Sequence, residues 1–185
     1  MSGSFKLLST KRFLPLFIAQ FLGAFNDNVF KNAMVILLTY RAAETLRPDL
    51  LVPLAAGLFI LPFFIFSAMA GQLADKYEKA KLVRLIKLYE LPCMLLGAYG
   101  FYLGDPFVLL FGLFLLGTQA AFFGPVKYGI LPELLPEDEL IGGNGLVEAG
   151  TFLAILIGTI AGGLYILGEN GVLIISALMT GISLI

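Results

Sequence analysis

The sequence of 185 residues contains no histidine, no tryptophan and a single cysteine, Cys93. A Ser-His-Asp triad and a His/Cys zinc site are therefore excluded, and an internal disulfide cannot form. Charged residues are also scarce, at 14% of the chain against about 25% in a typical soluble domain. With a formal net charge of −1, the chain lacks the basic excess of a nucleic-acid-binding protein. We therefore expect no metal, no cofactor and no nucleic-acid partner.

Hydrophobic residues, in contrast, make up 59% of the chain, and 17 of the residues are phenylalanine. A helix needs about 20 mostly apolar residues to cross the hydrocarbon core of a bilayer. Six segments are predicted to do so: approximately 13–40, 50–74, 82–103, 107–124, 145–167 and 171–185. Pro125 and Pro132 are expected to break the fourth helix near its end. The sequence thus predicts an all-α integral membrane protein.

The last of these segments is short. Fifteen residues from Gly171 to Ile185 extend about 22 Å as a helix, less than the core thickness of about 30 Å. No Lys, Arg, Trp or Tyr follows as an interfacial anchor. This favours a chain that stops inside its sixth helix, with a complete six-helix protein as the alternative.

Lysine and arginine are distributed unequally between the two ends of the predicted helices. If the N-terminus is cytoplasmic, the far side carries only Arg41 and Arg47. The cytoplasmic side then carries Lys6, Lys11, Arg12, Lys76, Lys79, Lys81, Arg84, Lys87 and Lys127. The positive-inside rule therefore predicts a cytoplasmic N-terminus.

Polar residues inside the first predicted span form a stripe. At 100° per residue, Gln20, Asp27 and Lys31 share one face, and Asn28 widens it. Charges within a membrane usually face a cavity or a partner. Asp27 and Lys31 have the i,i+4 spacing of a helical ion pair, so one interpretation is that they only neutralise each other. The other is a wet cavity that binds a polar or zwitterionic solute.

Three further charged residues need an explanation: Lys127 and Glu148, near the fourth and fifth predicted spans, and Glu90, in the third. Lys127 and Glu148 are candidate binding residues, although Lys127 could simply extend to the membrane interface. Glu90 follows Lys87 by three residues and is interpreted as its helical neighbour rather than a ligand. Residues 137–139, all acidic, are expected to form a solvated turn.

Small residues recur every four positions in the fifth predicted span, at Gly150, Ala154, Gly158 and Gly162. Such rows let two helices approach backbone to backbone. We expect this row to pack against another helix and to allow sliding during transport, without binding a ligand.

The connection after the second span contains a recognisable string. It includes Gly71, Leu73, Ala74, Asp75, Lys76, Lys79 and Lys81. The string resembles the loop between spans 2 and 3 of the major facilitator superfamily, G-x-L-A-D-(R/K)-x-G-(R/K)-x-(R/K), with Glu78 where the family usually has glycine. Gly71 is expected to permit close helix approach, and Asp75 to cap the next helix. The basic residues are expected to gate a cytoplasmic opening, or only to set topology.

Three other strings resemble one branch of that superfamily, the bacterial lysophospholipid transporters: residues 19–28, 125–131 and 144–149. The resemblance implies a twelve-helix major facilitator fold, of which this chain is the N-terminal six-helix half. It also implies inward flipping of lysophospholipids across the bacterial inner membrane for reacylation. Asp27, Lys127 and Glu148 match the polar positions of the family's motifs, whereas Gln20, Asn28 and Lys31 are added from the helical stripe.

The asparagine-rich segment 26–32 resembles most closely the version fused ahead of an acyltransferase and an acyl-carrier-protein synthetase. Two other functions stay open: a carrier for a small water-soluble solute, and a membrane anchor for such an acyltransferase. No P-loop is present, so transport is expected to be secondary or facilitated, and this segment is not expected to be an enzyme.

Overall fold

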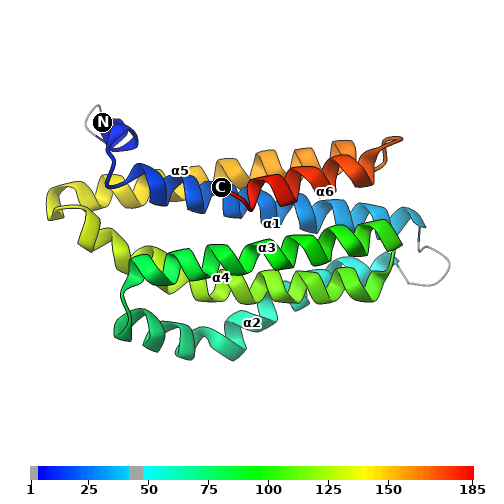
Figure 1. The fold of residues 1–185 in the computed structure, drawn as a ribbon, viewed down its shortest axis with the longest axis horizontal. Helices are drawn as coiled ribbons and strands as arrows, with labels where there is room; N and C mark the ends of the chain where they lie inside the picture. Colours follow the sequence, from blue (N-terminus) through cyan, green and yellow to red (C-terminus); the bar gives the residue numbers. More distant parts are fainter. Residues whose placement is uncertain (1–3, 42–47) are drawn as a thin grey trace.

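The computed structural model describes residues 4–41 and 48–185, and among these residues all regular elements are helices, without a strand. A short 3-10 helix, η1 (Ser4–Ser9), precedes six α-helices that run side by side along the long axis of the molecule (Figure 1). The helices are α1 (Leu14–Arg41), α2 (Pro48–Lys76), α3 (Lys79–Leu103), α4 (Pro106–Leu134), α5 (Glu137–Tyr165) and α6 (Gly171–Ile182).

The turn from α3 to α4 follows directly from three consecutive residues. Gly104 takes a left-handed conformation at φ 64° and ends α3, as glycine does most readily. The Asp105 side chain then accepts hydrogen bonds from the amides of Phe107 and Val108, while Pro106 occupies the first turn of α4. An aspartate cap followed by proline is a favourable helix start.

Two expectations about helix ends are wrong. Helix α4 continues through Pro125 and Pro132 to Leu134, because a helix in apolar surroundings keeps its other backbone bonds internal and tolerates the bond lost at proline. Residues 137–139 form the first turn of α5 rather than a separate turn. Their negative charge is favourable there, since the N-terminus of a helix carries partial positive charge.

The helices pack with an internal symmetry. The main partner of α1 is α5 and that of α2 is α4, while α3 packs on α4 and α6. If α1, α2 and α3 correspond to α4, α5 and α6, the α1–α5 pair corresponds to the α4–α2 pair. This correspondence is expected of two three-helix repeats. Both pairs meet at a glycine. A Cβ on Gly158 would lie 2.5 Å from the Phe25 carbonyl oxygen, and one on Gly117 would lie 2.3 Å from that of Phe59.

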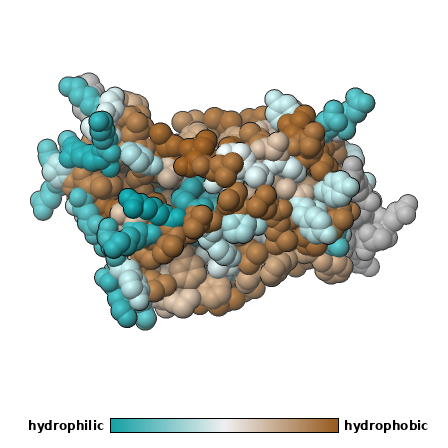
Figure 2. Space-filling model, viewed as in Figure 1, coloured by the Kyte–Doolittle hydropathy of each residue, from teal (hydrophilic) through white to brown (hydrophobic). Residues whose placement is uncertain are grey.

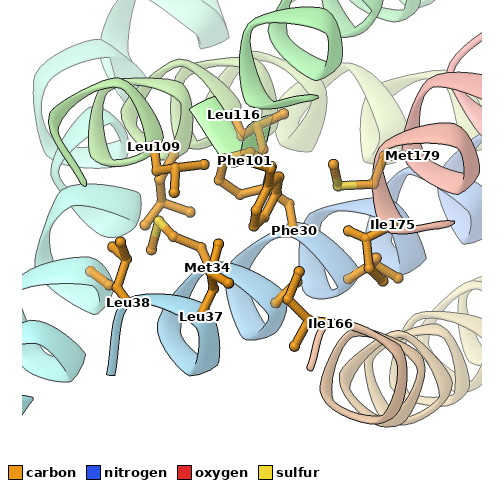
Figure 3. Packing of buried hydrophobic residues seen from close by; sticks show 14 of the residues in the cluster. Phe30, Met34, Leu37, Leu38, Phe101, Leu109, Leu116, Ile166, Ile175 and Met179 are labelled. Atoms are coloured by element: carbon orange, nitrogen blue, oxygen red, sulfur yellow. The ribbon is translucent and has the colours of Figure 1, made fainter. Parts of the chain in front are cut away.

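The core is apolar and joins all six helices (Figure 3). At its centre Phe30 of α1 is fully buried and meets the ring of Phe101 edge to face, with centroids 5.4 Å apart. A Cβ on Gly97 would lie 2.3 Å from the Phe30 ring, so this glycine leaves the space that the ring occupies. Phe30 therefore ties α1 to α3 through shape as well as burial.

The face of the molecule in Figure 2 is largely apolar between its two ends, although hydrophilic residues extend inward from one end. Large side chains such as Phe64, Phe107 and Leu164 are more than two-thirds exposed. Helices α2, α4 and α5 are long and apolar enough to cross a membrane, whereas α1 and α3 contain more charge. An exposed apolar surface of this extent is typical of a protein that lies in a membrane or packs against a partner.

Candidate functional site

A cavity of about 300 Å³ lies between α1 and α4, with single contributions from α2, α3 and α5. Its apolar or small lining residues include Phe63, Phe123 and Gly23. Its polar lining residues are Gln20, Asp27, Lys87, Gln119, Lys127, Tyr128 and Thr151. The cavity thus combines both signs of charge with apolar walls.

Asp27 lines this cavity, and Lys31 does not. Lys31 lies instead in a cleft between α1 and α2, with its Nζ 5.3 Å from the centre of the Phe59 ring. Within the described residues Asp27 and Lys31 form no ion pair, and Asp27 Oδ1 is buried without a hydrogen-bond partner. The ion pair suggested by their spacing is therefore absent. Side chains four residues apart leave the helix axis in directions that differ by about 40°. This difference is enough for Asp27 and Lys31 to face different helices.

The buried ion pair of the bundle is formed by Lys87 and Glu90 of α3. Lys87 Nζ lies 2.6 Å from Glu90 Oε2, and the Glu90 side chain is 1% exposed. Asn26 donates to the other Glu90 oxygen at 3.1 Å, and Gln119 donates to Oε2 at 3.4 Å. Asn26 also donates to the Met179 carbonyl at 3.0 Å. One carboxylate thus joins α1, α3 and α4.

Lys87 and Glu90 are helical neighbours, as predicted, but the contribution of Lys87 to the cavity was not predicted. The available signal was the charge of Glu90 in the middle of an apolar helix, since an ionisable residue within a membrane indicates function. The same argument was applied to Asp27. Neither Asn26 nor Gln119 could be assigned, because their role depends on how α1 and α4 face α3.

Gln20 lies in the cavity wall and connects α1 to α5. Its Nε2 donates to the Val147 carbonyl at 3.3 Å, and its Oε1 accepts from the Thr151 hydroxyl at 2.8 Å. Asn28, expected on the same face, does not line the cavity. It donates to the Ala24 carbonyl and packs at Gly158 of α5, because one residue after Asp27 the helix has turned by about 100°.

Lys127 and Glu148 come together through Tyr128. Lys127 lines the cavity, with its Nζ 4.5 Å from the centre of the Tyr128 ring. The Tyr128 hydroxyl donates to the Glu148 carboxylate. Glu148 is not a lining residue and contacts the site through this tyrosine, whose importance the sequence did not indicate.

The row of small residues on α5 faces α1. A Cβ on Gly150 would lie 2.7 Å from the Phe17 ring, and one on Gly162 would lie 2.6 Å from the Val29 carbonyl oxygen. Ala154, between them, is fully buried. Together with Gly158 these residues let the two backbones touch.

The connection between α2 and α3 differs from expectation at two positions. Outside its own stretch of helix, no atom of the described residues lies within 4 Å of a Cβ built on Gly71, so no close approach to another helix in this bundle requires glycine there. Asp75 lies in the last turn of α2, and Glu78 occupies the cap position of α3, although its side chain makes no capping hydrogen bond. Asp75 therefore does not cap α3, because α2 extends farther than predicted.

The three lysines of this connection have different partners. Lys76 Nζ lies 5.5 Å from the Tyr77 ring centre. Lys81 pairs with Glu78 at 2.7 Å, and its hydrogen bond lowers the pKa of that exposed carboxyl group. Lys79 pairs at 2.7 Å with Glu133 near the end of α4. Of these three lysines, Lys79 thus links two helices, α3 and α4.

We expect Lys79→Gln to increase the accessibility of this end of the bundle more than Lys81→Gln does. The first variant removes a bond between α3 and α4, whereas an exposed pair within one helix contributes about 0.3–0.5 kcal/mol. Labelling of a cysteine introduced at Gly129, which packs against the Lys79 side chain, measures the difference. Equal labelling of the two variants would contradict a gating role for Lys79.

The basic end of the molecule carries η1 and the α2–α3 and α4–α5 connections, at the left of Figure 1. Hydrophilic residues gather at this end in Figure 2. Of the two arginines expected on the other side, Arg47 lies outside the described residues, and so does the side chain of Arg41.

Comparison with known proteins places this geometry in context. The family model described as Major Facilitator Superfamily matches residues 16–185. Two similar curated proteins are the Lysophospholipid transporter LplT of Salmonella newport (strain SL254) and that of Salmonella heidelberg (strain SL476). Each is 39% identical over 155 residues, which cover 83% of this chain and 36% of the relative. The chain thus spans about a third of these relatives. No solved structure matches it.

Proposed function

Because the chain belongs to the major facilitator superfamily, as its match over residues 16–185 shows, we propose that it forms the N-terminal half of a lysophospholipid transporter. The transporter moves these lipids inward across the bacterial inner membrane, with the N-terminus of the chain in the cytoplasm. Six further helices complete the site, since such folds bind their substrates between repeats. This segment acts in transport and not as an enzyme.

The observation that carries the proposal is the composition of the cavity. Asp27, Lys87 and Lys127 line it together with Phe63 and Phe123. A lysophospholipid such as lysophosphatidylethanolamine has a phosphate, an ammonium group and one acyl chain. The lysines suit the phosphate, since lysine donates up to three hydrogen bonds. The unpartnered Asp27 oxygen suits the ammonium group, and the aromatic walls suit the start of the chain.

The similarity to lysophospholipid transporters supports the same substrate, and the apolar outer surface lets the acyl chain stay among membrane lipids. After transport, an acyltransferase that is fused to the transporter or associated with it restores the second chain. The asparagine-rich segment of α1 supports the fused arrangement.

The test is flipping of radiolabelled lysophosphatidylethanolamine by the full-length protein in vesicles. We expect Asp27→Asn to reduce the rate by about tenfold or more, because an amide replaces a charge-assisted bond to the ammonium group. Asp138→Asn, at an exposed position in the first turn of α5, serves as the matched control and should retain the rate.

Two results would contradict the proposal. If a water-soluble solute competes better than lysophospholipid, the protein is a carrier of another kind. If the full-length protein flips no lipid but a fused acyltransferase stays active without the membrane region, the membrane region is an anchor. Undiminished flipping by Asp27→Asn would remove Asp27 from the site without removing the function.

A further inference from the structure

Lys31, which does not line the main cavity, lines a second cavity. The cleft between α1 and α2 has a volume of about 240 Å³ and shares no lining residue with the cavity around Asp27. Lys31 and Asn32 contribute its polar groups, and Val52, Phe59 and Ile60 are among its apolar ones. Because α1 packs mainly on α5, and α2 on α4, the two helices leave this space between them. Val52 and Ile60 are about half exposed, so the cleft opens to the surface of the bundle.

The positive charge of Lys31 is only partly compensated. Among the described residues, no carboxylate lies within ion-pair distance of its Nζ, and the closest recorded partner is the face of Phe59 at 5.3 Å. Lys31 also lies ten residues before the end of α1, or about 15 Å along the helix. This is farther than a lysine side chain reaches, so the ammonium group does not extend to that end of the helix. An aromatic face replaces only part of its hydration, and an anion in the cleft would supply the rest.

The neighbouring Asn32 offers the opposite polarity. Its Nδ2 already donates to the Asn28 carbonyl at 2.9 Å and to the Thr159 hydroxyl at 3.2 Å. The amide oxygen is thus the group that remains for a ligand, and it is an acceptor. Lys31 therefore contributes a donor for an anion, and Asn32 an acceptor for a cation, to the lining of the same cleft with apolar walls.

We infer that the α1–α2 cleft is a second lysophospholipid site, in which Lys31 binds the phosphate and Asn32 accepts from the ammonium group. Apolar walls favour a lipid over free phosphate, which would lose its hydration there. Lys31 lies one turn beyond Asp27, toward the end of the bundle opposite Lys127. A lipid that enters from that end meets Lys31 before the main cavity, so the cleft is a loading site. The identity of the lipid and the direction of travel rest on the proposed function.

The experiment counts lipids bound to the full-length protein by native mass spectrometry, with lysophosphatidylethanolamine as the probe. We expect two bound molecules. Lys31→Met should weaken one of them about tenfold, the loss expected for one charge-assisted bond, and Lys31→Arg should retain it. Asp27→Asn should weaken the other. Lys11→Met, at an exposed position before α1, is the matched control and should bind both molecules.

Further arms separate the possible ligands. Glycerophosphoethanolamine, which has the same headgroup without a chain, and inorganic phosphate should both fail to occupy the Lys31 site. If either binds there as tightly as the lysolipid, the lipid assignment is wrong. Two molecules bound to Lys31→Met with unchanged affinity would overturn the inference altogether.

Failure of this inference is distinguishable from failure of the proposed function. If vesicles show no flipping but binding still depends on Lys31, the function is wrong and the site stands. If flipping is normal and binding is insensitive to Lys31, the site is wrong and the function stands.

Discussion

Replacement of Lys87 by methionine is expected to destabilise the protein severely and to abolish lipid flipping. The variant leaves Glu90, whose side chain is 1% exposed, as a buried carboxylate with only two amide donors, from Asn26 and Gln119. Breaking a buried ion pair by removing one partner costs roughly 3–5 kcal/mol. The free energy of unfolding of the full-length protein in detergent measures this effect.

A second substitution shows whether the uncompensated charge is the cause. Adding Glu90→Leu to Lys87→Met removes both charges, so the double variant should recover much of the stability. Flipping should stay low, because Lys87 lines the cavity. Lys127→Met, for which the described residues show no ion pair, should destabilise less than Lys87→Met. A double variant no more stable than Lys87→Met alone would contradict this explanation.

Gly158→Leu is expected to separate α1 from α5 and to eliminate transport. The added Cβ alone would lie 2.5 Å from the Phe25 carbonyl oxygen and 3.2 Å from Asn28 Cβ. Neither is the flexible end of a side chain, so the backbones must move apart. Overpacking of this kind costs about 1–3 kcal/mol or more. The yield of folded full-length protein and its flipping rate are the measurements.

Smaller changes on the same helix provide the control. Gly158→Ala should have an intermediate effect. Gly145→Ala should leave folding unchanged, because no described atom outside its own stretch of helix lies within 4 Å of its Cβ position. Equal stability of the two alanine variants would mean that the α1–α5 contact can relax. Wild-type flipping by Gly158→Leu would show that the row of small residues has no role in transport.

The difference between Asp27 and Lys31 illustrates where sequence analysis stops. Their spacing is compatible with an ion pair, but Lys31 contacts Phe59 of α2 instead. Spacing along one helix limits which side chains can meet, but it does not say which neighbouring helix offers a better partner. The same holds for Glu90, whose donors come from two other helices.

Long apolar segments and few charges were enough to predict an all-helical membrane protein. The superfamily, which the family match shows, was indicated by the resemblance of the string after the second span. This succeeds because each backbone group in hydrocarbon must bond within its own helix, so the requirement is local and visible in one stretch of chain. The composition of the cavity, the continuation of α4 through two prolines and the separate cleft at Lys31 depend on how helices rotate and pack against one another. Those contacts join residues up to 153 positions apart, such as Asn26 and Met179, and no local pattern encodes them.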